Sequence, residues 1–418
     1  MKTLLDIATC VLKKIDPFLL VKEHLGHIDI GGYSNLYVVG AGKGAARMAE
    51  AVEEYFGDAI RDGCIIMPEN EKTPNLASIQ YTYATHPYPN KNGMEGAKKI
   101  LEIANKAEKG DLIISLISGG GSALMCLPAE GVSLKEKIDT TTLLIKSGAN
   151  INEINTVRKH ISQIKGGFLA QALYPARCIN IVISDVIGDD LSTIASGPLS
   201  PDETTFADAL NVLDKYGLTD QVPQTVLRFL KEGKTETIKS GQGIFKGVDT
   251  TILANHQTVA DFAKRCCDDN DVPNEILATD CSGECRDKAV EILKKVIDQG
   301  KVYIITGETT VTIKGKGMGG RNQEFVLSCL NEIDKNLKWE DFTVLAIGTD
   351  GVDGICPQKT AGAVGTKETL AKAKELGLSM EKFLENNDSY HFFEKTDGLI
   401  VTGPTGTNLG DLMLIRRK

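Results

Sequence analysis

The sequence predicts an α/β protein with a mainly parallel sheet that helices cover on both faces. Short apolar runs such as LYVVG and LIISLIS alternate with helix-forming segments along most of the chain. These runs are apolar throughout, as in strands that are buried on both faces of a parallel sheet. Glycine-rich loops follow many of them, and glycine supplies 42 of the 418 residues, about a tenth of the chain, against a usual share of ~7%.

The first half of the chain predicts five strands with helices before and between them. Residues 4–15 carry apolar side chains at helical spacing, and Asp16 with Pro17 is typical of the start of a second helix. Ser133 and Glu136 form a capping-box pattern that starts a further helix. The strands are expected at residues 36–40, 64–68, 79–84, 112–118 and 178–184.

In the second half of the chain, the alternation of strands and helices is interrupted near residue 200 and then resumes. Two short helices are expected at residues 206–216 and 223–231. A polar, glycine-containing stretch follows at residues 232–248 and is the best linker candidate. We therefore expect domains at residues 1–235 and 236–418. Further strands are expected at residues 250–255, 275–279, 302–313, 343–348 and 398–403.

The segment GETTVTI suggests that the second domain contains a mixed sheet. Its alternation of Thr and Val is more typical of a strand pair or hairpin than of a crossover strand. The expected architecture is thus an α/β protein of two domains, the second with mixed strand directions.

Composition excludes several classes of function. The chain carries 47 Lys and Arg against 56 Asp and Glu, and neither sign forms a long block, which argues against a general nucleic-acid coat. No apolar run reaches the roughly 20 residues of a membrane helix. The apolar stretch at the N-terminus contains Asp6, which argues against a signal peptide. The ten cysteines lie in apolar runs, so we expect reduced thiols in a cytoplasmic protein.

Six glycine-rich segments follow strand-like runs and predict a ligand site. Ligands of open α/β sheets bind outside the carboxyl ends of strands, where helix N-termini attract anions. Six such loops, spread over both halves, predict a large polyanion held in the cleft between the domains. One such loop alone is equally consistent with a tight turn. The expected phosphate-binding residues are Gly40, Gly42, Gly44, Ser118, Gly119, Gly120, Gly121, Ser122, Gly317, Gly319 and Gly320.

Lys43 lies in the first of these loops, GAGKGAA. The loop only partly matches the dinucleotide-binding fingerprint, and it does not have the spacing of a Walker A loop. A cation where a glycine loop meets a helix start is well placed to touch phosphate oxygens. The competing interpretation is a solvated surface lysine.

Arg321 follows the most unusual string of the chain, GKGMGG. The macrodipole disfavours a cation at the start of a helix, so Arg321 suggests an anionic partner such as a transferring phosphoryl group. Without a ligand, the loop would be a flexible basic turn.

Acidic loops supply the carboxylates that phosphoryl transfer needs. Asp185, Asp189 and Asp190 follow one strand, and Asp350 and Asp353 follow another. Such carboxylates can hold Mg²⁺ or accept a hydroxyl proton, although each could simply stabilise a turn. We rank Asp185, Asp189 and Asp350 as candidates for these roles.

Other motifs carry less information. Cys281 and Cys285 lack the spacing of a zinc ribbon, and no Cys/His pair follows them. The six histidines are scattered, and SGGGS does not match a hydrolase nucleophile elbow.

The motifs together resemble those of the class II glycerate kinases, the glycerate 2-kinases with a MOFRL-type C-terminal half. The resemblance rests on VVGAGKGAARMA, THPYPN, ISGGGSAL, NTVRKHIS, VISDVIGDDLSTIASGP, TGETTVTIKGKGMGGRNQEF, GTDGVDG, NDSYHFF and TGPTGTNLGDL, and it covers nearly the whole chain. Ile355 and Cys356 depart from the family's usual continuation of the GTDGVDG loop.

The resemblance implies a larger Rossmann-like domain followed by a smaller α/β domain, with the active site between them. It implies transfer of the γ-phosphoryl group of ATP to the 2-hydroxyl of D-glycerate, with Mg²⁺. The family's catalytic lysine and arginine correspond to Lys43 and Arg321. Asp185 and Asp189 are the further catalytic candidates, and Asp189 and Asp350 are the metal candidates. We expect a monomer or homodimer that acts in carbohydrate metabolism.

Two alternatives remain open at this point. Some family members have been described as hydroxypyruvate reductases, so an NAD(P)-dependent reductase is the second hypothesis. A nucleotide-binding regulator without catalysis is the third, although it would not need the Lys, Arg and Asp constellation.

Overall fold

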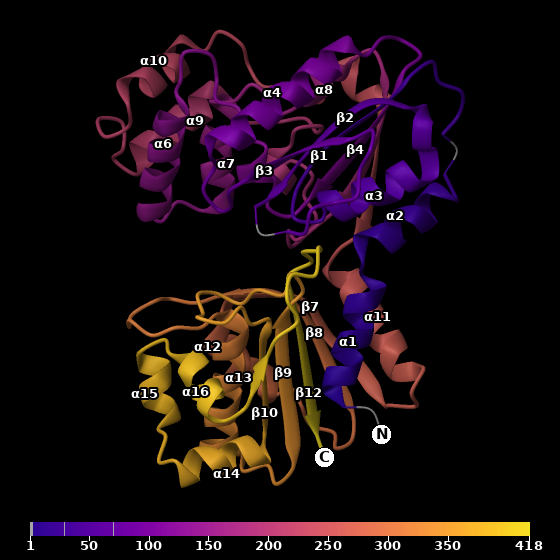
Figure 1. Cartoon of the computed structure of the whole chain (residues 1–418). Coiled ribbons are helices and arrows are strands. Elements are labelled where there is room, and N and C mark those ends of the chain that lie inside the picture. The colour runs from indigo at the N-terminus through magenta and orange to yellow at the C-terminus, as the bar shows by residue number, and fades with distance from the viewer. Residues whose placement is uncertain (1–2, 29, 70) are drawn as a thin grey trace. The chain divides into compact units, whose positions relative to one another are not determined.

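The computed structural model describes residues 3–28, 30–69 and 71–418, which form two compact units. The larger unit comprises residues 17–253, and the smaller unit combines residues 1–16 with residues 254–418. Each unit contains one six-stranded sheet (Figure 1).

The larger unit has the predicted parallel sheet. Its strands lie in the order β3-β2-β1-β4-β5-β6, and β1 to β5 pair in parallel with their neighbours. Strands β1 and β4 at the centre are buried along their whole length, which explains their uninterrupted apolar sequences. The strands are β1 (Leu36–Ala41), β2 (Ile60–Pro68), β3 (Gln80–Ala84), β4 (Leu112–Ser118), β5 (Arg177–Ile183) and β6 (Val248–Ala254).

Helices cover both faces of this sheet, with α2 and α3 on one side and α4 and α8 on the other (Figure 1). The resulting three-layer α/β arrangement is the one expected for continuous apolar strands. The helices of the unit are α2 (Pro17–Leu25), α3 (Ala45–Phe56), α4 (Lys91–Lys106), α5 (Gly121–Leu124), α6 (Leu134–Lys146), α7 (Ile151–His160), α8 (Phe168–Leu173), α9 (Phe206–Lys215) and α10 (Gln224–Glu232).

Four of these helices, α6, α7, α9 and α10, share a separate apolar core. The start of α6 follows the sequence pattern: the Ser133 hydroxyl accepts from the Glu136 amide, and the Glu136 carboxylate accepts from the Ser133 amide.

Among the described residues, no helix combines the length and apolar character needed to cross a bilayer.

The smaller unit has a mixed sheet, as predicted, with strand order β11-β10-β9-β12-β8-β7. Strands β7 and β8 are parallel, whereas the other pairs are antiparallel. The expected hairpin in GETTVTI is wrong, because β8 runs as one strand to Thr310. The strands are β7 (Asn274–Glu284), β8 (Val302–Thr310), β9 (Phe342–Gly348), β10 (Gly362–Thr366), β11 (Leu399–Ile400) and β12 (Asp411–Arg417).

Helices also cover this sheet on both faces. Helices α1 and α11 pack on one side, and α12 and α13 on the other (Figure 1). The helices are α1 (Leu4–Lys14), α11 (His256–Asp268), α12 (Cys285–Leu293), α13 (Arg321–Glu332), α14 (Lys367–Glu375), α15 (Met380–Glu385) and α16 (Ser389–Lys395).

The compact units differ from the division expected at residues 235 and 236. Helix α1 packs on α11 and belongs with the C-terminal half, and β6 completes the first sheet instead of opening the second. Both segments look like ordinary α/β elements in sequence. Their partners lie far away along the chain, so the local pattern carried no sign of which sheet they join.

The expectation of ten reduced thiols is also wrong. Cys10 of α1 and Cys266 of α11 form a disulfide within the smaller unit, with their Cα atoms 6.4 Å apart. Seven of the eight free cysteines are buried, as expected for core thiols, and Cys356 is half-buried.

The disulfide predicts a specific thiol count. Protein purified without reductant, denatured and alkylated should carry eight labels, because Cys10 and Cys266 are joined. Mass spectrometry of a digest should then show the peptides of these two residues linked, and reduction should separate them. Ten labels without reduction would contradict the assignment.

Candidate active site

In the larger unit, the loops that follow β1 and β4 pack directly on each other. The Lys43 amide donates to the Gly119 carbonyl oxygen at 2.9 Å, and the Gly44 amide donates to Ser118 Oγ at 2.9 Å. The two loops come from adjacent parallel strands, so their carboxyl ends meet at one edge of the sheet. The structure thus brings together two of the predicted phosphate-binding segments.

Glycine is required in the first loop by this packing. Gly42 has φ +144°, and a Cβ there would lie 2.0 Å from Ser118 Oγ. At Gly40, a Cβ would lie 2.6 Å from the Leu116 carbonyl oxygen. The close approach of two strand ends therefore explains these two glycines without a ligand.

Lys43 is half-buried at the junction of these loops. Gly120 has φ +84°, and a Cβ at this position would lie 3.6 Å from Lys43 Cγ and 3.2 Å from His86 Cδ2. The lysine stem, Gly120 and His86 therefore lie side by side. This position excludes the interpretation of Lys43 as a fully solvated surface lysine.

Ser122, at the end of the second loop, begins a series of side-chain hydrogen bonds that was not expected from the sequence. Its hydroxyl lies 2.9 Å from Ser196 Oγ, and Ser196 donates to Asn155 Oδ1 at 3.2 Å. Ser196 and Asn155 are buried and come from segments that are remote in sequence from the SGGGS loop. The only sequence signal for them was their place within motifs of the resemblance.

The three aspartates of the acidic loop after β5 have different surroundings. Asp190 accepts from the Ser192 amide and from the hydroxyls of Ser192 and Thr193, at 2.7–2.9 Å. It thus stabilises its own turn, the alternative role foreseen for these residues. Asp185 and Asp189 are half-buried, and Asp189 has φ +53°. They remain the candidates for chemistry in this loop.

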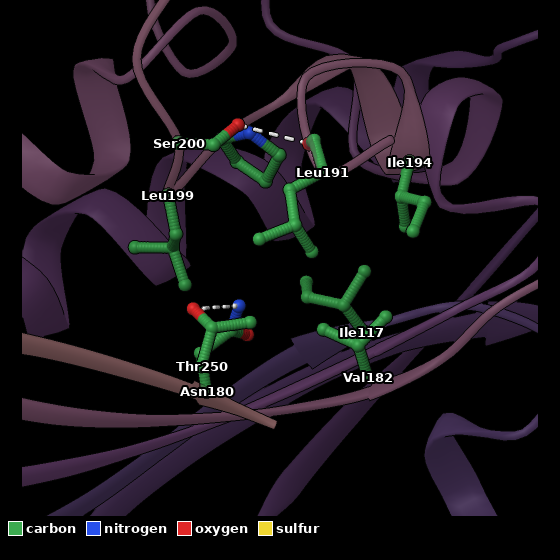
Figure 2. Close-up of a pocket in the computed structure, with 9 residues that line it drawn as sticks. Ile117, Asn180, Val182, Leu191, Ile194, Leu199, Ser200 and Thr250 are labelled. Carbon is green, nitrogen blue, oxygen red and sulfur yellow. Dashed lines mark hydrogen bonds between the residues drawn. The ribbon is translucent and has the colours of Figure 1, made fainter. Parts of the chain in front are cut away.

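A small apolar cavity lies between this region and the sheet (Figure 2). Its volume of about 10 Å³ is no larger than a water molecule requires. Within it, Asn180 donates to Thr250 Oγ1, and Ser200 donates to the Leu191 carbonyl oxygen (Figure 2). The cavity is therefore a packing feature and not a substrate site.

In the smaller unit, Arg321 is the first residue of α13 and already has anionic partners in the fold. Its Nε donates to both carboxylate oxygens of Asp411, at 2.7 and 3.0 Å, and its Nη1 donates to Glu308 Oε1 at 2.7 Å. These carboxylates compensate the cation at the helix start. The fold thus supplies Arg321 with anionic partners of its own, Asp411 and Glu308.

Asp411 is fully buried at the start of β12 and also accepts from Asn322 Nδ2 at 2.8 Å. Burial raises the pKa of Asp411 to about 6, an effect that Arg321 opposes. Burial alone would lower the pKa of Arg321, but Asp411 and Glu308 outweigh it and raise that pKa above its ordinary value. Arg321 therefore stays charged at every physiological pH.

The glycine-rich loop before Arg321 is packed against residues 386–389. The amides of Lys314 and Gly315 donate to Asn387 Oδ1, and the Met318 amide donates to Asp388 Oδ1. A Cβ at Gly317, Gly319 or Gly320 would lie 2.2–2.4 Å from a neighbouring residue. Close packing with this segment accounts for Gly317 and Gly319, and close packing with Asp353 accounts for Gly320. Several loop amides are already hydrogen-bonded.

The loop after β9 also supports the start of α13. Asp353 is buried, and its carboxylate accepts from the amides of Asn322 and Gln323 at 3.0 and 2.8 Å. Asp350 is half-buried and accepts from the Val352 amide at 3.0 Å, as in a turn. The loop thus holds the helix that carries Arg321.

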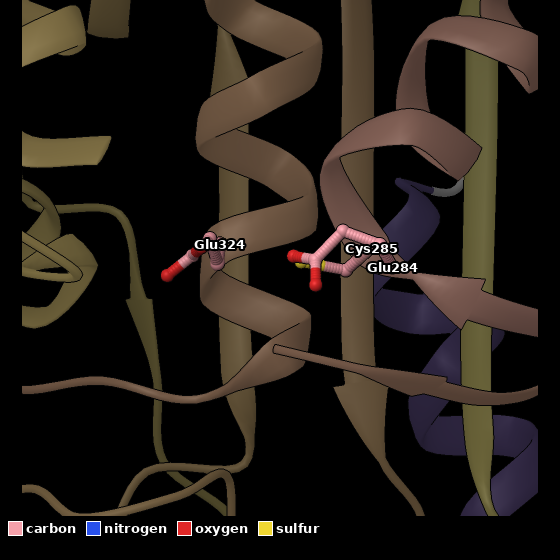
Figure 3. A group of neighbouring side chains, drawn as sticks. All are labelled: Glu284, Cys285 and Glu324. Carbon is pink, nitrogen blue, oxygen red and sulfur yellow. The ribbon is translucent and has the colours of Figure 1, made fainter. Parts of the chain in front are cut away.

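One group in this unit has the composition of a metal site, namely Glu284, Cys285 and Glu324 (Figure 3). The Glu324 carboxylate already accepts from Arg286 Nε at 2.6 Å and from Asn387 Nδ2. Burial raises the pKa of the Cys285 thiol well above its ordinary value, so the ligating thiolate is disfavoured. The zinc interpretation of this region stays as weak as its sequence spacing suggested.

Comparison with known proteins identifies the family. A family model described as "Domain of unknown function (DUF4147)" matches residues 3–231, and the MOFRL family model matches residues 301–411. The D-glycerate 2-kinase of Thermotoga maritima is 36% identical over 422 residues, which cover 99% of this chain and 97% of that protein. The glycerate 2-kinase of Pyrococcus horikoshii is 38% identical over 393 residues, which cover 91% of this chain and 86% of that protein.

The same fold occurs in solved structures. The crystal structure of the Thermotoga maritima glycerate kinase matches with a TM-score of 0.86 over 99% of this chain and 98% of its own. A Pyrococcus horikoshii structure matches with a TM-score of 0.79 over 99% and 97%, at 35% identity. Fold and comparisons together define a two-unit α/β kinase. The chain belongs to the glycerate kinase family with the DUF4147 and MOFRL domains.

The packing at Gly42 predicts a sharp steric requirement. Gly42→Ala should destabilise the larger unit by about 1–3 kcal/mol or more, because its Cβ meets Ser118 and φ +144° disfavours a side chain. Thermal denaturation of the two proteins measures the effect. Gly241→Ala is the matched control, since no atom lies within 4 Å of a Cβ there. Equal melting temperatures for both variants would contradict the packing argument.

Proposed function

We propose that the protein phosphorylates D-glycerate at the 2-hydroxyl, with ATP as donor, and releases 2-phosphoglycerate and ADP. The observation that carries this proposal is similarity along almost the entire chain to proteins named glycerate 2-kinase, at 31–38% identity. The half-buried position of Lys43, beside two adjacent loops at strand ends, supports it independently.

Lys43 and Arg321 are proposed to stabilise the transferring phosphoryl group. The charge of this group spreads over its equatorial oxygens, so positioned cations lower the barrier. The loop that carries Lys43 is fixed to the loop after β4 by the hydrogen bonds of the Lys43 and Gly44 amides. Arg321 is fixed through Nε and Nη1, and its Nη2 donates to none of the described residues. That nitrogen is suited to a phosphate oxygen.

Mg²⁺ is proposed as the cofactor that accompanies ATP and neutralises its charge. Hard carboxylate oxygens are its preferred protein ligands. Asp185 and Asp189 fit this chemistry, because they are half-buried carboxylates in the loop directly after β5. Asp350 stays a weaker metal candidate, since one of its oxygens accepts from Val352. Asp185 and Asp189 are equally the candidates to accept the hydroxyl proton.

The remaining sequence-based expectations stay predictions. These are the phosphate-binding roles of the loop glycines, the cytoplasmic location, the monomeric or homodimeric state and the role in carbohydrate metabolism. The reductase hypothesis rests on proteins of Agrobacterium vitis named putative hydroxypyruvate reductase, at 35% identity.

The regiochemistry predicts a direct signal in a coupled assay. Purified protein with ATP, Mg²⁺ and D-glycerate should drive enolase and pyruvate kinase without phosphoglycerate mutase, because 2-phosphoglycerate is the substrate of enolase. Because enolase and pyruvate kinase themselves need Mg²⁺, metal dependence is measured without them: in EDTA, the protein should form no 2-phosphoglycerate by ³¹P NMR, and added Mg²⁺ should restore its formation. A signal that needs the mutase would mean 3-phosphoglycerate, and NADH oxidation with hydroxypyruvate in the absence of ATP would favour the reductase.

The proposed cations predict a loss of kcat. Lys43→Ala and Arg321→Lys should each lower kcat by about 10²–10³-fold with a smaller change in KM, because the contacts strengthen in the transition state. The lysine at position 321 keeps a charge beside buried Asp411, so the fold is retained, but it lacks the planar fork. The exposed controls Lys146→Ala and Arg228→Lys should match wild type. Near-normal kcat in either test variant, with a folded circular dichroism spectrum, would remove that residue from the proposed mechanism.

A further inference from the structure

The larger unit contains a second, roomier cavity whose lining is cationic. Its volume is about 310 Å³, and it lies between residues 86–89, the segment after α5, helix α6 and helix α7. Lys137 of α6 and Arg158 of α7 line it, and no Asp or Glu does. Neither residue was among those expected from the sequence to bind a ligand.

A third cation, Lys165, lies in the same region. Lys165 is fully buried and donates to the Ala195 carbonyl oxygen at 3.0 Å. Lys137 is 3% exposed and donates to the carbonyl oxygens of Arg158 and Ile161, at 3.0 and 2.6 Å. Burial lowers the pKa of Lys165 well below its ordinary value, and the neighbouring cations add to this effect. Burial also lowers the pKa of Lys137, to about 8.

These three cations have no counter-charge within the described part of the chain. None of them forms an ion pair there, and the half-buried Arg158 guanidinium makes no hydrogen bond to any described residue. Elsewhere the fold does pair its buried cations: Lys159, next to Arg158 on α7, lies 3.4 Å from Asp202. Because a desolvated charge without a partner is costly, this cavity is suited to an anion from solution.

The cavity is contiguous with the candidate active site of the same unit. His86 and Ser122 line it, and His86 lies against Gly120 and Lys43, as described above. An anionic group bound near Arg158 would therefore leave the rest of a small molecule close to Lys43. Three-carbon acids are small enough for this space, and a guanidinium fork matches a carboxylate.

We propose that this cavity binds the carboxylate of the acceptor substrate, with Arg158 in direct contact and Lys137 beside it in the cavity lining. The assignment rests on the proposed function and names the site that recognises glycerate as an acid. It also explains how one hydroxyl is selected, since a fixed carboxylate sets the distance of each hydroxyl from the phosphoryl donor.

Arg158→Gln tests the assignment in the full-length protein. KM for D-glycerate should rise about 10- to 100-fold, the effect of losing a charge-assisted hydrogen bond, whereas KM for ATP should stay within about twofold. The neutral analogue D-glyceramide should react with the same kcat/KM in both proteins. Arg158→Lys should lie between wild type and Arg158→Gln. The exposed Arg228→Gln is the matched control and should change nothing.

Thermal stability supplies a second, independent measurement. Since the Arg158 guanidinium makes no hydrogen bond or ion pair to any described residue, Arg158→Gln should melt at the wild-type temperature or above it without ligands. Added D-glycerate should raise the melting temperature of wild type but not of the variant. A variant that unfolds or melts well below wild type would contradict the absence of a partner.

Three kinetic results would overturn the proposal. An unchanged KM for D-glycerate would remove Arg158 from substrate binding. A raised KM for ATP alone would assign the cavity to the triphosphate instead. An equal loss for D-glyceramide would mean that the carboxylate is not what Arg158 recognises. If wild type phosphorylates no glycerate at all, the proposed function fails first, and this site fails with it.

Discussion

The architecture of the larger unit depends on how closely the ends of β1 and β4 approach each other. Ser118 Oγ occupies the space in which a Cβ of residue 42 would lie, and the Gly44 amide donates to that oxygen. This contact sets the path of the loop that carries Lys43 into α3. The parallel register of the two strands brings the loops to one sheet edge, and glycine lets their backbones touch.

Charge compensation organises the two units differently. In the smaller unit, Asp411 and Glu308 hold Arg321, and Asp353 caps its helix, so the cation is rigid before any ligand arrives. In the larger unit, Lys137 and Lys165 are buried, and within the part of the chain that the structure describes they donate only to carbonyl oxygens. A preorganised cation suits transition-state stabilisation, whereas an uncompensated cavity suits binding of an anion.

The glycines of the loop before Arg321 are explained by close packing, which a sequence motif alone does not reveal. The loop before Arg321 packs against residues 386–389, and its amides donate to Asn386, Asn387 and Asp388. Gly315, Gly317 and Gly319 are needed for that packing whether or not a phosphate also binds. The family membership is consistent with both roles, because a loop held in this way presents Arg321 in a fixed orientation.

By itself, the sequence determined the fold class, most strands, the start of α6 and the neighbourhood of Lys43. These features depend on local patterns: continuous apolar runs, a capping pair three residues apart and glycines at strand ends. Only the tertiary structure decided that α1 joins the C-terminal unit, that β6 closes the first sheet and that Cys10 meets Cys266. It also decided that Asp411, 90 residues away, pairs with Arg321, and that Lys137 and Arg158 face one cavity. Such contacts join residues remote along the chain, and their energy arises from burial and charge that no local pattern records.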